Sequence, residues 1–127
     1  MLLPCEVAVK TVIPSIRALL ARTLMEKHGM KELQVAKLLG VSQSAVSKYV
    51  TRTRGSVMKI EETPELRSIV SKMTSALISS PGQSAELLLL FCQACRHIRD
   101  KGYMCPFCRG FQEIKIDECS FCNNSQR

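Results

Sequence analysis

Hydrophobic residues recur at helical spacing along most of the chain, and this pattern predicts a series of helices. The strongest part lies between Met30 and Gly55, where apolar residues would fill one shared core between two short helices joined by a tight turn. These residues are Val35, Leu38, Leu39, Val41, Val46, Tyr49 and Val50.

The residues between these two helices have the chemistry of a tight turn. Ala36 provides a small side chain where the first helix must pass close to the second. Gly40 suits the positive φ that is common at a helix C-terminus, and Ser42 offers a hydroxyl N-cap to the next helix. This spacing is restrictive, and it predicts a helix-turn-helix.

The second helix of this pair would present polar side chains to its surroundings. Gln can form paired hydrogen bonds with adenine edges, Ser can bond to either groove partner, and Lys or Arg can hold phosphates. The pattern therefore favours binding of double-stranded DNA, and the alternative is a helical hairpin whose polar side meets water or a protein. The outward residues are Gln43, Ser44, Ser47, Lys48, Thr51 and Arg52, and Ser42 precedes them.

Residues 14–55 resemble a Cro/repressor-type helix-turn-helix, and residues 1–55 resemble predicted transcriptional regulators of archaea. The resemblance is carried by PCEVAVKTVIPSIRALLA and ELQVAKLLGVSQSAVSKY. It implies a supporting helix from residue 32 to 39 and a recognition helix from residue 42 to about 53. Two positions depart from the family: Glu32 replaces a Gln that approaches phosphate, where Lys31 could take over, and Val50 replaces a frequent Glu.

The net charge of +7 is confined to one half of the chain. Residues 1–60 contain ten Lys or Arg and three Asp or Glu, whereas residues 61–127 contain eight of each. This is expected if the first half binds a polyanion. Arg52 and Arg54 are placed to follow a phosphate backbone. The basic segment lacks the exposed apolar side that binding to a membrane surface would need.

Two helices are predicted before the motif. The first falls within residues 1–12, and the second runs from Pro14 to His28, where Gly29 ends it. We expect the second helix to pack across the two motif helices and to complete their core. Cys5 is interpreted as a small buried hydrophobic residue, and His28 as structural.

Two more helices are predicted after the motif, over residues 64–80 and 84–101. Thr63 followed by Pro64 is a helix start, and Ser84 can cap the next helix. Four consecutive leucines, at residues 87–90, make that helix apolar on every side, so we expect it to be buried all round. A second subunit would supply the missing surface, and a homodimer suits two-fold DNA half-sites. The alternative is an intramolecular hairpin of the two helices.

The chain is therefore expected to be all-α. It contains no Trp and few aromatic residues, which suits a helical bundle better than a β-sandwich. We predict a DNA-binding domain over residues 1–57, a helical and dimerising segment over residues 58–101, and a Cys-rich tail over residues 102–127.

Six of the seven cysteines form three Cys-x2-Cys pairs, and this pattern predicts metal binding. Two residues between thiols allow one backbone turn to aim both sulfurs at one ion, and two such turns build a tetrahedral site. Zinc is the default cofactor, and an iron–sulfur cluster is the alternative. The pairs are Cys92/Cys95, Cys105/Cys108 and Cys119/Cys122.

The spacing allows two ways in which these pairs could share a metal ion. The first two pairs could share a metal and fix the tail to the preceding helix, or the last two could form a minimal zinc ribbon. Either leaves one pair over, which could form a redox-sensitive disulfide, and all six could also serve a two-metal or iron–sulfur arrangement. The segment CPFCRG favours a knuckle turn, and GFQEIKIDE alternates as a small β-hairpin would.

We interpret the protein as a sequence-specific transcription regulator, and we expect no enzymatic activity. The alternative is a zinc-knuckle module that docks onto a protein of the transcription apparatus and has only weak DNA affinity. A thiol–disulfide enzyme is disfavoured because Cys92 and Cys95 fall near a helix end, where the helix dipole opposes a thiolate.

No signal peptide and no membrane span are expected, and cysteine pairs of this kind indicate a reducing, cytoplasmic setting. We expect no small-molecule effector, because the chain ends too early for a separate ligand-binding domain.

Overall fold

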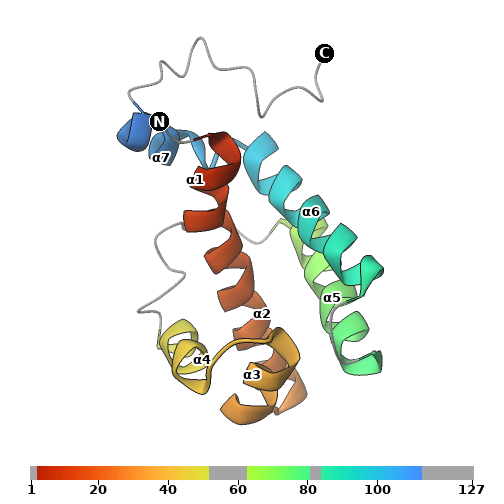
Figure 1. Cartoon of the computed structure of the whole chain (residues 1–127). Helices are drawn as coiled ribbons and strands as arrows, with labels where there is room; N and C mark the ends of the chain where they lie inside the picture. The colour runs from red at the N-terminus through yellow and green to blue at the C-terminus, as the bar shows by residue number, and fades with distance from the viewer. Residues whose placement is uncertain (1–2, 52–62, 81–83, 113–127) are drawn as a thin grey trace.

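The computed structural model describes residues 3–51, 63–80 and 84–112, and every regular element in these ranges is an α-helix. This confirms the all-α prediction (Figure 1). The helices are α1 (Pro4–Lys10), α2 (Val12–His28), α3 (Glu32–Leu39), α4 (Gln43–Val50), α5 (Pro64–Ser79), α6 (Ala85–Asp100) and α7 (Cys105–Gln112).

The first two helices follow one another with a break at Thr11. Helix α1 starts at Pro4, which is tolerated in the first turn because its missing N–H would have no partner there. Helix α2 starts at Val12, before the predicted position, so Pro14 lies in its first turn for the same reason. It ends as predicted at Gly29, whose φ of 64° is left-handed.

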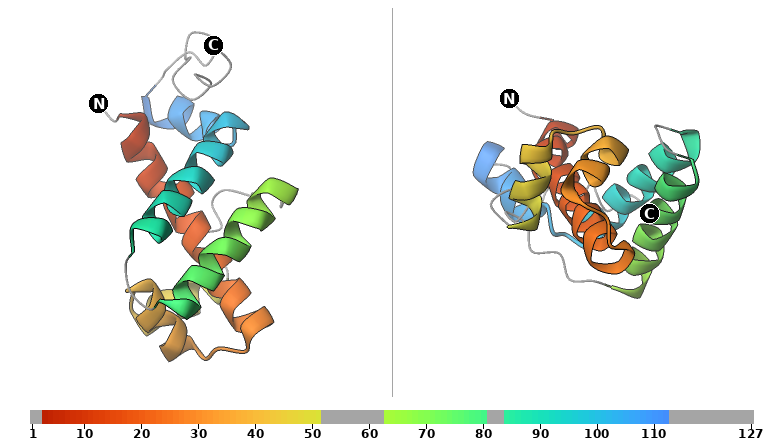
Figure 2. Two further views of the ribbon diagram at one scale, coloured as in Figure 1. Left: turned by 90° about the vertical axis from the view of Figure 1, so that its right-hand side faces the viewer. Right: turned by 90° about the horizontal axis from the view of Figure 1, so that it is seen from below.

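Helix α2 is the centre of the structure, since it contacts α1, α3, α4, α5 and α6. Figures 1 and 2 show α4 and the α5–α6 pair on different sides of it. Large side chains and alanines alternate on its buried sides, and the alanines permit close approach of neighbouring helices. The fully or almost fully buried residues are Val12, Ile16, Ala18, Leu20, Ala21 and Leu24.

Helices α5 and α6 pack directly on each other as an intramolecular hairpin. The predicted caps are confirmed, because Thr63 Oγ1 accepts from the Leu66 N–H and Ser84 Oγ from the Leu87 N–H, each at 3.2 Å. A link that the sequence did not reveal joins the two helices: Thr63 Oγ1 and His97 Nε2 lie 2.9 Å apart.

The expectation that the leucine-rich helix is buried all round is wrong for the single chain. Leu87 and Leu90 are buried, but Leu88 is 46% exposed and Leu89 is 64% exposed. The reason is that α6 has neighbours on only part of its circumference, where α5 and α2 lie. The fully apolar run therefore leaves large hydrophobic side chains at the surface of the hairpin.

Two predictions about cysteines also need correction. Cys5 is exposed, because the buried residues of α1 are Val7 and Ala8 in its later turn. The segment CPFCRG begins an α-helix, α7, where a knuckle turn was expected. Pro106 is compatible with both outcomes because proline is favoured in a first helical turn. The predicted β-hairpin begins inside α7, and its part from residue 113 onward lies outside the described residues.

Buried side chains from all seven helices form one hydrophobic cluster. The predicted boundary at residues 57/58 lies outside the described residues, so the division into three domains stays a prediction. Within the described ranges, no helix is both long and apolar enough to cross a membrane.

Candidate nucleic-acid interface

Only three residues separate α3 from α4. Gly40 has a φ of 67°, a left-handed conformation that costs other residues energy because of their Cβ. The Val41 N–H donates to the Ala36 carbonyl at 3.0 Å, which satisfies an otherwise unpaired group at the end of α3. Ser42 Oγ then accepts from the Ala45 N–H at 3.1 Å and caps α4.

One side of α4 is buried against α2 and α3. Ala45, Val46 and Tyr49 all lie in the core, and the Val46 side chain has no exposed surface. Because these residues recur three or four positions apart, the opposite side of the same helix must face outward.

The outward side of α4 holds the predicted recognition residues. Gln43, Ser44 and Lys48 are exposed, and Ser47 is half-buried. Thr51 is exposed at the C-terminal end of the helix, where its hydroxyl donates to the Ser47 carbonyl at 2.9 Å. The structure therefore places amide and hydroxyl groups at the start of the helix and a lysine toward its end.

A side chain from α2 holds the C-terminal end of α4 in place. Arg22 Nη1 donates to the Tyr49 carbonyl at 3.3 Å. A cation at this position is favourable because the last carbonyls of a helix carry partial negative charge. The sequence carries no local signal of this contact, because Arg22 and Tyr49 are 27 residues apart.

Lys31 is the N-cap residue of α3, and its side chain is exposed. The backbone N–H of Lys31 donates to Gln34 Oε1 at 3.1 Å, so the Gln34 side chain stabilises the first turn of the helix. Glu32 is half-buried in the same turn, where a carboxylate is favoured by the helix dipole. The other two predicted phosphate contacts, Arg52 and Arg54, lie outside the described residues.

A polar helix supported in this way has the dimensions required to enter a DNA groove. The major groove is about 12 Å wide, and an α-helix with its side chains is about 10–12 Å across. The short turn at Gly40 fixes α4 relative to α3, so base-reading side chains would be presented on a rigid element.

Residues 22–55 match the family model described as Helix-turn-helix. The match covers the end of α2, both motif helices and the residues that follow them. It confirms the expected helix-turn-helix and supports a DNA-binding transcription regulator. Comparison with curated proteins and with solved structures gave no match.

The described cysteines are distributed over three helices. Cys92 is exposed and Cys95 half-buried on α6, while Cys105 is half-buried and Cys108 buried on α7. Among the described residues, no three cysteine, histidine or acidic side chains come together as ligands of one metal ion. The grouping of Cys92/Cys95 with Cys105/Cys108 is therefore not assembled in this arrangement, and Cys119 and Cys122 lie outside the described residues.

Burial raises the pKa of the Cys95 thiol above its usual range, although a hydrogen bond with Arg99 acts in the opposite direction. Electrostatic interactions with the Cys92 and Cys5 thiols make smaller contributions that also raise this pKa. A raised pKa keeps the Cys95 thiol protonated at neutral pH. This environment differs from that of a reactive thiolate.

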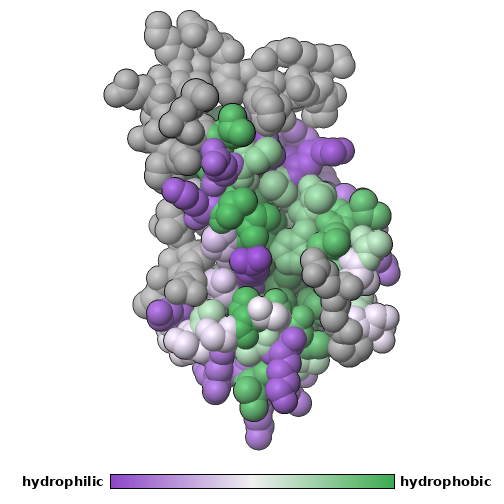
Figure 3. All heavy atoms as spheres, in the orientation of Figure 1, coloured by the Kyte–Doolittle hydropathy of each residue, from purple (hydrophilic) through white to green (hydrophobic). Residues whose placement is uncertain are grey.

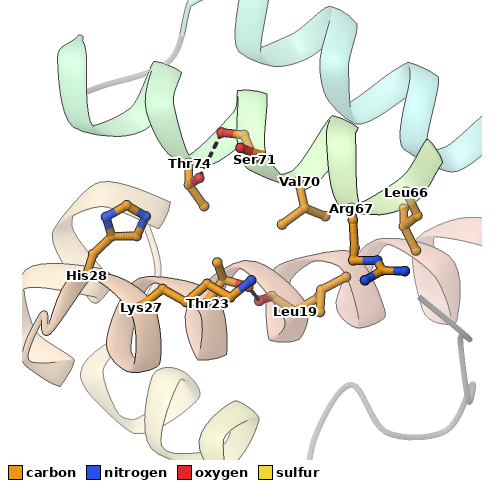
Figure 4. A pocket seen from close by; sticks show the side chains of 9 residues that line it. All are labelled: Leu19, Thr23, Lys27, His28, Leu66, Arg67, Val70, Ser71 and Thr74. Carbon is orange, nitrogen blue, oxygen red and sulfur yellow. Dashed lines mark hydrogen bonds between the residues drawn. The ribbon is translucent and has the colours of Figure 1, made fainter. Parts of the chain in front are cut away.

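A small cavity of about 90 Å³ separates α2 from α5, and Figure 4 shows the side chains around it. Two hydroxyl groups that line it donate to carbonyls of their own helices: Thr23 to the Leu19 carbonyl at 2.7 Å and Thr74 to the Ser71 carbonyl at 2.9 Å. The cavity lies between two packed helices and is small compared with pockets that bind organic ligands, which measure about 300–1,000 Å³.

Proposed function

We propose that the protein is a sequence-specific DNA-binding transcription regulator that works as a homodimer and carries a metal site in its Cys-rich tail. The observation that carries the DNA-binding part is the two-sided character of α4. Its apolar side is buried against α2 and α3, and this orientation leaves its polar side exposed. The helix-turn-helix match over the same residues supports this conclusion.

The side chains of α4 would contact different parts of the DNA, according to their chemistry. Gln43 and Ser44, in the first turn, would form hydrogen bonds with base edges, because the N-terminal residues of a recognition helix reach deepest into the groove. Lys48 on α4 and Lys31 before α3 would contact phosphates. Phosphate contacts position the protein, whereas base contacts provide the sequence preference.

Replacing Gln43 by Ala should remove a specific base contact and leave general DNA affinity largely intact. On a duplex selected from a random library by the wild-type protein, we expect a loss of about 1–3 kcal/mol for this variant. Lys48→Gln should instead weaken binding to all sequences and lower the slope of log affinity against log salt by about one. Fluorescence anisotropy at several salt concentrations measures both quantities.

Lys72→Gln is the matched control, because Lys72 is an exposed lysine on α5 and lies outside the helix-turn-helix. It should change neither the sequence preference nor the salt slope. If Gln43→Ala keeps the wild-type preference while Lys72→Gln reduces affinity, the placement of the interface on α4 is wrong.

The dimer proposal rests on the exposed leucines of α6. Large hydrophobic side chains at a protein surface can mark an interaction site, and Leu88 and Leu89 on α6 are both exposed. A second copy of the chain is the partner we propose, since two helix-turn-helix units related by two-fold symmetry fit two half-sites in successive major grooves.

Leu89→Lys should convert the dimer to a monomer without unfolding the chain, because the Leu89 side chain is already 64% exposed. The matched control is Val9→Lys, since Val9 on α1 is also 64% exposed. Sedimentation equilibrium should give twice the chain mass of 14.2 kDa for the wild type and for Val9→Lys, and 14.2 kDa for Leu89→Lys. A wild-type protein that stays monomeric at high concentration would contradict the dimer.

We further propose that Cys105, Cys108, Cys119 and Cys122 hold the metal. Cys105 and Cys108 are three residues apart on α7, so their side chains lie on the same side of the helix. The other grouping is disfavoured by the positions of the described thiols. Zinc would act there as a structural link, and an iron–sulfur cluster would add sensitivity to oxidation.

Metal analysis and absorption spectra of protein purified without oxygen test this grouping. Cys108→Ser and Cys122→Ser should lose the metal, whereas Cys92→Ser and Cys5→Ser should keep it. A colourless zinc protein indicates a structural link, and a brown protein with iron and sulfide indicates a cluster. Loss of the metal in Cys92→Ser would overturn the proposed grouping.

A further inference from the structure

An open groove of about 450 Å³ lies where α2, α3, α5 and α6 come together. Most of its lining side chains are apolar, and they include Leu88, one of the exposed leucines. Figure 3 shows hydrophobic surface gathered between α2 and α6 on this side of the molecule. The lining residues are Ile13, Arg17, Lys37, Leu38, Leu39, Gly40, Leu77, Leu87, Leu88 and Phe91.

The charged groups at this groove have one sign. Arg17 from α2 and Lys37 from α3 are both exposed, and no acidic residue is among the described residues that line it. Apolar walls with two cations from different helices are complementary to a molecule that has an apolar body and a negative group.

The volume of the groove suits a small molecule. Ligand pockets for small molecules have volumes of about 300–1,000 Å³, and this groove falls inside that range.

We propose that the groove binds a small amphipathic organic anion, with an apolar chain or ring against the leucines and Phe91 and a carboxylate between Arg17 and Lys37. This ligand differs from the expectation of no small-molecule effector, which could not take account of a groove assembled from four helices that are distant in the chain. The carboxylate would accept charge-assisted hydrogen bonds from both cations.

The position of the groove connects the ligand to the proposed function. Leu38, Leu39 and Gly40 belong to the supporting helix and to the turn before α4, while Leu87 and Phe91 belong to the hairpin. A bound molecule would contact both parts at once. Any effect on DNA affinity rests on the proposed function, whereas binding itself does not.

Titration calorimetry of the full chain with decanoate, and with 1-decanol as its neutral counterpart, tests the proposal. Decanoate should bind at least about tenfold more tightly than the alcohol, because only the carboxylate can use both cations. The double variant Arg17→Gln/Lys37→Gln should lose about this factor for decanoate and leave the alcohol unchanged. Lys72→Gln/Arg96→Gln removes an exposed lysine and arginine elsewhere and should bind as the wild type does.

A second variant, Phe91→Glu, adds a negative charge to the groove wall at a half-buried position outside the proposed dimer interface, and it should abolish decanoate binding with an unchanged circular dichroism spectrum. The proposal is overturned if the wild type binds no decanoate, if the alcohol binds equally well, or if the groove and control variants behave alike. Decanoate binding by a chain with no DNA affinity would overturn the proposed function and leave this inference standing.

Discussion

Burial of one side of α4 against α2 and α3 is the interaction on which the rest of the structure depends. Val46 and Tyr49 can reach the core only if Gln43 and Lys48 face outward, because all four lie on one short helix. The left-handed turn at Gly40 fixes where α4 begins, and Arg22 holds its other end. The packing of this small core therefore determines which side chains of α4 are exposed.

Helix α2 extends this constraint to the second half of the chain. It contacts the two motif helices and also both helices of the hairpin, so the proposed DNA-binding and dimerising parts share one helix and one hydrophobic cluster. The groove lined by Arg17 and Lys37 lies where these parts meet. A dimer interface on α6 and a ligand in the groove would therefore both act next to the supporting helix.

The features that could be predicted from the sequence are those determined by neighbouring residues. Gly40, Ser42, Thr63 and Ser84 end or cap helices through contacts within a few positions, and each does so in the structure. The features that were missed depend on distant contacts or on which side of a helix has a neighbour. They include the bonds of Arg22 and His97, the exposure of Cys5, Leu88 and Leu89, and the groove. The helical form of α7 was missed for a local reason, because Pro106 is compatible with both a helix start and a knuckle turn.

The most direct test of the account is the change in backbone amide NMR signals of the full chain on addition of double-stranded DNA. If α4 is the recognition helix, the largest changes should fall on Gln43–Val50, with smaller ones near Lys31 at the start of α3. They should shrink as salt is added, because phosphate contacts release counterions. Changes confined to α6 and α7, with α4 unaffected, would contradict the central claim.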